Sequence, residues 1–406
     1  MSFLWLVVAL RLLLSGRTVL NAPHTLTGDI EFYFNTARLS DSGFYPFIHF
    51  WVEYPPVFPA LLSGLYRLLA ALGMADLEWF AAVYAFLMSG VDLVNLVLVY
   101  RLVQRVRGER AARWAGMIYA GCPALVWVNA GWFDALAVLT MLGAVLALLD
   151  RRPIVAGVLI GLGAATKLFP VVLILAAPAV LGRPGTLRLA AAAGGVVAAM
   201  LAPLALIRSD LLVASFASMA VRGPWETIPA LLSGYYGWGR MPLLAERFTA
   251  ESAFVSTPTP VWLSLLPQAV LLVAVWAAWR VCRRGQPQPR DVCAVAALAV
   301  ITFVLGNKGY SPQFVAWLVP VIVMAWPNRS GLAYVGLLSA HTLAYGQLVF
   351  PMMLSFYQGG EGVLEEVAIM VTVSVLLRTA VMAIMAANLC WDIIRSPNRS
   401  GRALAV

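Results

Sequence analysis

Long apolar stretches, separated by short clusters of arginine, are the dominant pattern along this chain. Segments such as 115–128 and 187–207 are apolar almost throughout, without the alternation that lipid-facing strands of a barrel show. Because a backbone in lipid must satisfy its own hydrogen bonds, apolar runs of about 17–25 residues are expected to be helices. The pattern therefore predicts an all-α fold, a polytopic bundle of transmembrane helices.

The apolar segments predict about twelve spans in total. After a first span and a long loop, the others follow in order; the predicted ranges are 3–20, 79–100, 113–129, 134–150, 153–166, 168–182, 187–207, 261–281, 291–306, 313–326, 331–350 and 367–393. Two short ones, 153–166 and 168–182, are expected to be broken helices that meet at Lys167. No internal repeat or linker divides the chain, so residues 1–406 are predicted to form one membrane domain.

The positions of the basic residues predict the orientation of the bundle. Arginines gather between the apolar segments, at 101–113, 151–152, 183–188, 280–290 and 395–402. Such loops are cytoplasmic in most membrane proteins, so both termini are predicted to be cytoplasmic, in the cell inner (plasma) membrane. The net charge of +9 then reflects orientation and contact with membrane lipids, and no nucleic-acid partner is expected.

Two long segments are predicted on the extracytoplasmic side, at about 21–78 and 208–260. The apolar stretch 55–72 could be a further span, but this would move the arginines of 101–113 to the outside. We therefore predict a helix at the membrane interface, entered through Pro55, Pro56 and Pro59. In this topology fourteen of the nineteen acidic residues are external, and the functional groups are expected there.

Three carboxylates in the first external segment, Asp29, Glu31 and Glu53, lie among aromatic residues. A carboxylate that is partly removed from water can act as a general base, because burial and neighbouring charges change its pKa. Alternatively, Asp29 could cap a helix that starts at the next residue. The three acids could also hold a divalent cation, but a metal is not favoured, and no cofactor is predicted.

Lysine is rare in this chain, which has 26 arginines but only two lysines, Lys167 and Lys308. Both lysines lie at predicted external ends of helices. A compact ammonium with rotatable donors suits a phosphate oxygen, so both are candidates for binding a phosphate. The alternative is that they extend to the membrane interface, which would not explain why arginine is absent at these positions.

Other polar residues in or beside the spans have two interpretations each. The turn 129–134 brings Trp132 and Asp134 together and could bind a sugar, or it could belong to an interfacial aromatic belt. His341, within a predicted span, is a functional candidate or a hydrogen-bonded structural histidine. Asp92, in another span, could pair with Asn95 or with a neighbouring helix.

Four motifs occur in order along nearly the whole chain. They are Gly28-Asp29, Glu53-Tyr54-Pro55-Pro56, Ala165-Thr166-Lys167-Leu168-Phe169-Pro170 and Lys308-Gly309-Tyr310-Ser311-Pro312-Gln313. In this order the chain resembles the GT-C-fold membrane glycosyltransferases, specifically family 87, the polyprenol-phosphate-mannose-dependent α-mannosyltransferases. The resemblance implies juxtamembrane helices in the first external loop, which agrees with the interpretation of 55–72.

The resemblance also implies a reaction. One sugar, mannose, would move from a polyprenyl-phosphate carrier to a glycolipid or glycan acceptor on the extracytoplasmic side, with inversion. Asp29 matches the family's catalytic acid and would deprotonate the acceptor hydroxyl, although Glu31 could share or take this role. Positive charge around the leaving phosphate would come from Lys308, with help from Lys167, Ser311 and Gln313. The candidate substrate contacts are Tyr33, Tyr54, Trp132, Asp134, Tyr310 and His341.

Two alternatives stay open. The first is transfer of another sugar, such as arabinofuranose, from the same kind of carrier. The second is a non-enzymatic lipid or sugar transporter, a flippase, which would use ionisable groups within spans and an internal repeat. Asp92, His341 and Arg378 are such groups, but the sequence shows no repeat.

Overall fold

Helices make up 85% of the structure, a computed structural model that describes residues 2–20, 28–234, 241–254, 261–284, 287–352 and 365–395. Within these ranges no β-strand is present, and only isolated bridges such as Trp225 with Gly309 occur. The predicted all-α fold class is therefore confirmed.

The order of the helices follows the predicted apolar segments. In the first half of the chain the longer helices are α1 (Ser2–Leu20), α5 (Leu77–Arg107), α8 (Asp134–Leu149), α9 (Pro153–Thr166) and α10 (Ala177–Val221). In the second half they are α12 (Val261–Cys282), α13 (Pro289–Gly306), α14 (Val315–Ala325), α15 (Arg329–Ala344) and α17 (Glu365–Arg395). Shorter elements between them are α3 (Gly28–Arg38), η1 (Leu39–Ser42), α4 (Val57–Ala71), α6 (Glu109–Ala120), α7 (Pro123–Gly131), η2 (Phe169–Ala176), α11 (Ile228–Leu232), η3 (Leu244–Phe248), η4 (Ala250–Phe254), η5 (Pro312–Phe314) and the π-helical turn η6 (Tyr345–Val349).

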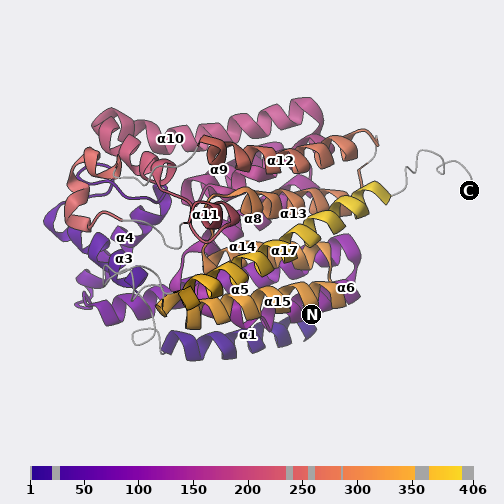
Figure 1. Ribbon diagram of the computed structural model, residues 1–406, viewed down its shortest axis with the longest axis horizontal. Coiled ribbons are helices and arrows are strands. Elements are labelled where there is room, and N and C mark those ends of the chain that lie inside the picture. Colours follow the sequence, from indigo (N-terminus) through magenta and orange to yellow (C-terminus); the bar gives the residue numbers. More distant parts are fainter. Residues whose placement is uncertain are drawn as a thin grey trace, which may run out of the picture.

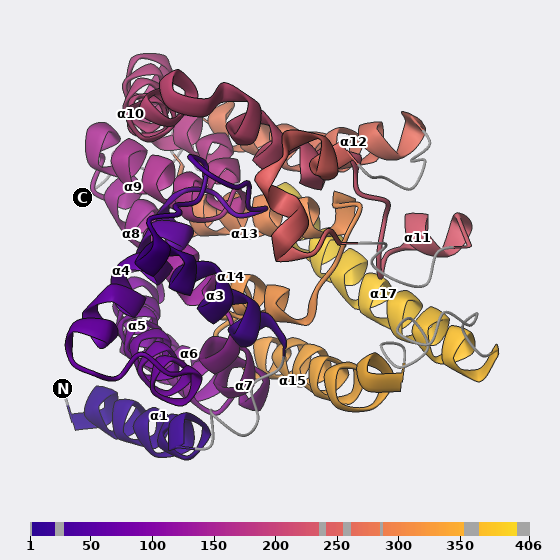
Figure 2. The same cartoon turned by 90° about the vertical axis from the view of Figure 1, so that its left-hand side faces the viewer.

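The long helices lie side by side, and α3 and α4 gather at one end of the bundle (Figure 1). The start of α1 and the end of α17 lie toward the opposite end (Figure 1). Seen from the α3–α4 end, α10 and α12 lie along one edge of the bundle and α1 lies at the opposite edge (Figure 2). The side of the membrane that each end faces stays a prediction.

Within the described ranges, four helical stretches are long and apolar enough to cross a membrane: Leu77–Arg107, Phe169–Val221, Pro289–Gly306 and Glu365–Arg395. Helices α7 and α8, which are bent by 111° at their junction, make a fifth if they form one broken span. The predicted count of about twelve is not confirmed, because other predicted spans are shorter or broken apolar helices. The chain is nevertheless a multi-pass membrane protein by the length and composition of these helices.

Two predicted spans differ in their course from a single straight helix. Residues 113–129 form parts of α6 and α7, because the helix breaks at Gly121 and Cys122 and Pro123 occupies the first turn of α7. Helix α10 continues through the arginines of 183–188 to Val221, with non-helical backbone at Gly182 and Arg208. It therefore extends into the predicted external segment 208–260.

Helix α4 corresponds to the predicted interfacial helix. It has 15 residues, a length of about 22 Å, and is therefore shorter than a hydrocarbon core of about 30 Å. Its apolar face, which includes Phe58 and Leu62, packs against Ile30 and Tyr33 of α3. We call α3 and α4 together the end cap. Whether α4 lies at the interface stays a prediction.

Arg11, which interrupts the first predicted span, forms a buried ion pair with Asp92 of α5. Arg11 Nε lies 2.6 Å from Asp92 Oδ2, and the two side chains are 0% and 1% exposed. Asp92 Oδ1 also accepts hydrogen bonds from Tyr119 (2.8 Å) and Asn129 (2.6 Å). Asp92 therefore pairs with a neighbouring helix, while Asn95 donates to a backbone carbonyl of α8. The pairing explains how both charges are tolerated inside the bundle.

Two glycines of α9 allow α10 to approach closely. A Cβ atom at Gly157 would overlap the carbonyl oxygen of Leu189, and one at Gly161 would overlap that of Ala193. Small residues at this spacing are typical of contacts between membrane helices. The contact fixes the direction of α9 and hence the position of Lys167, which follows its last residue.

Candidate active site

Breaks in the helices position most of the predicted site residues. Trp132 and Phe133 lie between α7 and α8, and Lys167 follows α9 in an extended conformation before η2. Residues 307–311 lie between α13 and η5. Side chains at helix ends are not covered by a following turn, so they can point to a common site. The predicted break at Lys167 is confirmed.

Asp29 lies in the first turn of α3, which begins at Gly28. Its half-buried carboxylate accepts a hydrogen bond from Trp132 Nε1 through Oδ2 at 2.6 Å. Burial raises the pKa of Asp29, and the carboxylates of Glu53 and Asp134 act in the same direction, whereas the Trp132 hydrogen bond and the Lys167 ammonium oppose the increase. A raised pKa brings a carboxylate closer to the operating range of a general base.

Asp134 and Lys167, which were predicted separately, form one ion pair. Lys167 Nζ lies 2.7 Å from Oδ1 and 2.9 Å from Oδ2 of Asp134, which is 1% exposed. Trp317 Nε1 donates to the same Asp134 Oδ1 at 2.5 Å. The Lys167 ammonium also lies over the ring of Phe133, 4.6 Å from its centroid. The two charges of the pair lie close enough to Asp29 to act on its pKa, in opposite directions.

Glu53 joins the two segments that were predicted to be external, through an ion pair with Arg247 of η3. The guanidinium of Arg247 also lies 4.6 Å from the ring centroids of both Phe32 and Trp51. Trp51 is bonded to the same segment, through its backbone N–H to the Arg247 carbonyl (3.0 Å) and through Nε1 to Ser252 Oγ (2.8 Å). Residues 241–254 are therefore held against residues 51–53.

The geometry separates the three acids that were candidates for a general base. Glu31 is exposed, and two residues along a helix place it on a different face from Asp29. Glu53 is neutralised by Arg247. Asp29 has no ion-pair partner within the described residues and keeps Oδ1 without a hydrogen bond there. In the same ranges, no group of three His, Cys, Asp or Glu side chains is arranged to hold a metal ion.

Tyr33 and Tyr54 lie in an aromatic cluster beneath Asp29. Their ring centroids are 5.9 Å apart, and the Tyr54 ring lies 5.2 Å from that of Phe133. Burial raises the pKa of both phenols well above the usual range, so both hydroxyls stay neutral. Tyr33 is only 1% exposed, whereas Tyr54 is half-buried. Tyr54 is therefore the better placed of the two to contact a substrate.

Lys308 belongs to a second group of residues, which surrounds the end of α10. Its ammonium donates to the carbonyl oxygens of Ala220 (2.7 Å) and Arg222 (2.6 Å). Burial and then the charge of Arg222 lower the pKa of Lys308 to about 8. Lys167 and Lys308 therefore have different hydrogen-bond partners, and the two ammonium groups share none.

The backbone beside Lys308 is paired with Trp225. Trp225 N–H donates to the Lys308 carbonyl at 3.1 Å, and Tyr310 N–H donates to the Trp225 carbonyl at 3.0 Å. Trp225 Nε1 also donates to Ser311 Oγ at 3.3 Å. The Trp225 ring lies so close to Gly309 that a Cβ atom there would overlap it. A glycine is therefore needed at this position of the predicted motif.

Arg378 of α17 brings Tyr310 and His341 into this second group. Its guanidinium carbon lies 3.6 Å from the Tyr310 ring centroid, and Nη2 donates to the Glu226 carbonyl. Nε and Nη1 of Arg378 are buried and have no hydrogen-bond partner within the described residues. His341 Nε2 lies 2.7 Å from the Oγ atom of Ser374, one turn before Arg378. His341 thus has the hydrogen bond of a structural histidine and also lies beside a buried cation.

An aromatic segment connects the two groups. The Phe314 ring lies 5.3 Å from Tyr310, 3.9 Å from Trp317 and 5.8 Å from the Lys167 ammonium. Gln313 is half-buried in the same segment. Its side chain forms no hydrogen bond with the residues that the structure describes, so its role as a phosphate ligand stays a prediction.

Sequence reasoning missed three residues that complete these groups, and it named a fourth, Arg378, only as an ionisable group that a flippase could use. Trp317 and Trp225 are tryptophans in apolar surroundings, which are usually core residues, and Arg247 lies in a segment without a motif. Arg378 did carry a signal, because an ionisable residue within a predicted span is a functional candidate. The sequence did not show that it lies on Tyr310.

Comparison with known proteins identifies one family and a set of distant structures. The model of "Glycosyltransferase family 87" matches residues 51–306. No curated protein matches the chain.

Solved structures to which the chain is distantly similar include the apo oligosaccharyltransferase of Archaeoglobus fulgidus. The TM-score is 0.47, the identity is 14%, and the match covers 96% of this chain and 55% of that chain. Another is ArnT from Cupriavidus metallidurans bound to undecaprenyl phosphate, with a TM-score of 0.46, 15% identity, and coverage of 97% and 78%. This chain therefore spans about half the length of the oligosaccharyltransferase.

Proposed function

Because the chain belongs to glycosyltransferase family 87, whose model matches more than half of it, we propose that it transfers mannose from a polyprenyl-phosphate carrier to a glycolipid or glycan acceptor. The resemblance predicted from the four motifs is confirmed at the level of the family. The proposed reaction takes place on the extracytoplasmic side of the inner (plasma) membrane. The observation that carries the mechanism is the half-buried Asp29, bonded to Trp132 beside the Asp134–Lys167 pair.

Asp29 acts as the general base in this proposal. Trp132 holds Oδ2, so Oδ1 is left to accept the proton of the acceptor hydroxyl. The acceptor oxygen forms a bond to the anomeric carbon as the bond from that carbon to the phosphate oxygen breaks. The products are the glycosylated acceptor with inverted configuration and the polyprenyl phosphate, and the proton stays on Asp29 until solvent removes it.

Lys308 stabilises the leaving phosphate. An ammonium has three N–H donors, and two of those of Lys308 point to backbone carbonyls, so one remains for a phosphate oxygen. With a pKa of about 8, Lys308 is mostly protonated at neutral pH. A fixed positive charge where negative charge develops lowers the barrier. Ser311 and Gln313 follow Lys308 in the chain and can add hydrogen bonds to the same phosphate.

Lys167 has a different task, because its charge is already compensated by Asp134. We assign it to hold Asp134 and to set the electrostatic environment of Asp29, whose pKa it lowers against the effect of burial. Tyr54 and Trp132 lie beside this group and provide ring faces for the sugar C–H groups.

The test is a transfer assay with purified protein in lipid nanodiscs. Polyprenyl-phosphate-[³H]mannose is supplied with a lipid extract from the host, and wild type is compared with Asp29→Asn and Asp76→Asn. Asp76 provides a matched control, because its exposed carboxylate only caps α5 by accepting from Trp79 N–H. We expect wild type and Asp76→Asn to form labelled product at similar rates, and Asp29→Asn to form it about 10²–10⁴-fold more slowly.

Two other outcomes would contradict the proposal in different ways. Transfer of label from an arabinofuranosyl carrier, with none from the mannosyl carrier, would replace the sugar but keep the enzyme class. Movement of the labelled carrier across vesicle bilayers, without any transfer product, would replace the enzyme by a flippase.

A further inference from the structure

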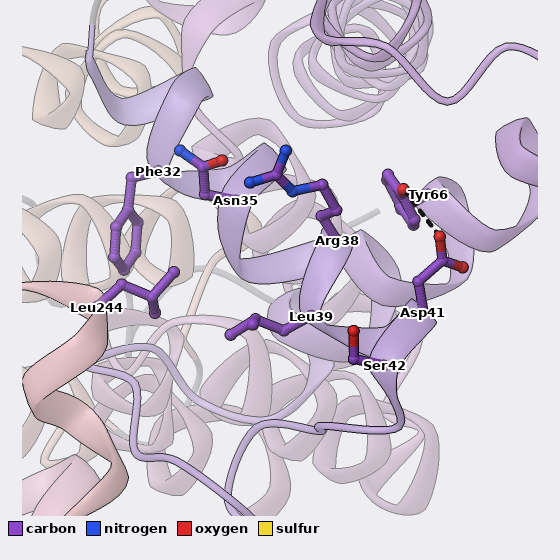
Figure 3. A pocket seen from close by; sticks show the side chains of 8 residues that line it. All are labelled: Phe32, Asn35, Arg38, Leu39, Asp41, Ser42, Tyr66 and Leu244. Carbon is purple, nitrogen blue, oxygen red and sulfur yellow. Dashed lines mark hydrogen bonds between the residues drawn. The ribbon is translucent and has the colours of Figure 1, made fainter.

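A cavity of about 600 Å³ lies at the end cap, lined by residues of α3, η1, α4 and η3. Its lining combines polar side chains, Asn35, Arg38 and Asp41, with the rings of Phe32 and Tyr66 and with Leu244 from η3 (Figure 3). The volume lies within the range of about 300–1,000 Å³ that is typical of small-molecule sites. None of the residues assigned to the reaction above lines this cavity.

The polar groups of the cavity are available to a ligand. Figure 3 shows the Asn35 amide and the Arg38 guanidinium side by side on one face of α3. Neither side chain forms a hydrogen bond with the described residues. The Arg38 guanidinium contacts the Phe34 ring, with its carbon 5.6 Å from the ring centroid. Asp41 accepts from the Tyr66 hydroxyl through Oδ2 at 3.1 Å, which leaves Oδ1 available. The cavity therefore offers both donors and acceptors.

This combination fits a saccharide better than an anion. Hydroxyl groups of a sugar both donate and accept, and its C–H faces can pack on the half-buried ring of Phe32. A phosphate or another anion would gain from Arg38 but would be opposed by the Asp41 carboxylate, which lines the same cavity. The charges of the two side chains cancel, so an uncharged ligand that forms several hydrogen bonds is favoured.

The cavity also continues the proposed active site. Phe32 lies one helical turn after Asp29, and its ring packs on Arg247, the partner of Glu53. Asn35 lies six residues after Asp29, or about 9 Å along the axis of α3. A glycan whose reacting hydroxyl lies at Asp29 can therefore place its preceding sugars in the cavity.

We propose that this cavity is a subsite for the acceptor, and that the acceptor is an oligosaccharide chain rather than a single sugar. This inference rests on the proposed function for its position in the reaction. Segment 241–254 contributes Leu244 to the wall, and the Glu53–Arg247 ion pair holds this segment in place. The second external segment thus completes the subsite.

The first test measures binding without any transfer. Protein in lipid nanodiscs, which avoid the sugar head groups of maltoside detergents, is titrated with α-mannotriose and with methyl α-mannoside while saturation-transfer NMR signals are recorded. The variants are Asn35→Ala/Arg38→Ala and, as a matched control, Arg67→Ala. Arg67 is an exposed arginine of the same end cap that donates to the Tyr45 hydroxyl at 2.7 Å and does not line the cavity.

We expect wild type and Arg67→Ala to bind the trisaccharide equally and the double variant to bind it about tenfold more weakly, because hydrogen bonds to uncharged partners are lost. Binding of methyl α-mannoside should be the same in all three proteins. Equal trisaccharide binding by the double variant, or no binding by wild type, would overturn the inference.

A second test separates this inference from the proposed function. In the transfer assay, the double variant should show about a tenfold higher KM for a trisaccharide acceptor, with the KM for a monosaccharide acceptor and for the donor unchanged. An equal loss with both acceptors would contradict a subsite. If wild type binds the trisaccharide through Asn35 and Arg38 but transfers no sugar, the proposed function fails and the saccharide site stands.

Discussion

Two carboxylates of this protein, Asp92 and Asp29, lie among aromatic and polar groups but differ in how their oxygens are used. Asp92 is 1% exposed, with Oδ2 on Arg11 and Oδ1 on a phenol and an amide. Asp29 is half-buried, with Oδ2 on Trp132 and no hydrogen bond to Oδ1 within the described residues. A carboxylate whose oxygens all have partners within the fold has none left for a substrate, whereas one with a free oxygen can accept a proton from a second molecule.

The difference follows from position in the bundle. Asp92 lies within α5, where an unpaired charge would be costly, so its partners neutralise it completely. Asp29 lies in the end cap, where a second molecule can reach the remaining oxygen. The comparison indicates that Asp92 is fully used by contacts within the fold, whereas Asp29 keeps an oxygen for chemistry.

The largest effect is expected when Asp29 is replaced by asparagine. Asp29→Asn removes the proton acceptor, and the rate of transfer should fall about 10²–10⁴-fold, the usual contribution of a general base. The melting temperature should stay close to that of wild type. Transfer rates and thermal melting are measured side by side with Glu31→Gln, which changes an exposed acid of the same helix. If Glu31→Gln rather than Asp29→Asn stops transfer, Glu31 is the base.

At Asp92 we expect a loss of stability rather than a specific loss of transfer. Asp92→Ala leaves Arg11 buried without its partner, which should lower the free energy of unfolding by about 3–5 kcal/mol. Thermal unfolding in nanodiscs measures this loss. The double variant Arg11→Met/Asp92→Leu removes both charges and should recover most of the stability. A stable Asp92→Ala protein with no transfer activity would instead place Asp92 in the reaction.

A smaller effect is expected where Trp225 packs on residue 309. Gly309→Ala places a methyl group against the Trp225 ring, and such overpacking costs about 1–3 kcal/mol. The shift should also displace Lys308 and reduce transfer. The control is Gly64→Ala in α4, where a Cβ atom would meet nothing within 4 Å, and the same methyl group should be neutral or stabilising. Equal melting temperatures for the two variants would show that the contact with Trp225 is not tight.

The smallest effect concerns pH. Asp29 must be deprotonated to act, so the transfer rate should rise as pH increases through its raised pKa. Lys308 must be protonated, so the rate should fall above its pKa of about 8. One unit above that value the rate is expected to be about tenfold lower. A pH–rate profile of wild type and Lys308→Arg measures this, because arginine stays charged and should remove the alkaline decrease. An unchanged decrease in Lys308→Arg would assign it to another group.

The sequence alone predicted the features that depend on local composition. Apolar length identified the helices, because lipid requires each to satisfy its own backbone, and the helix break at Lys167 was visible as a short apolar segment on either side. The order of four motifs identified the family. Asp29, Lys167 and Lys308 became candidates because acids beside aromatic residues and lysines in an arginine-rich chain are unusual.

Only the tertiary structure decided which of these groups meet. Asp29 and Trp132 are 103 residues apart in sequence, and Glu53 and Arg247 are 194 apart. Arg11 and Asp92 are each a single charge in an apolar helix, and only the packing of α1 against α5 pairs them. The number of spans also depended on helix breaks and bends that hydropathy does not register. The physical reason is that transfer into lipid is a property of each segment, whereas a hydrogen bond depends on how distant segments pack.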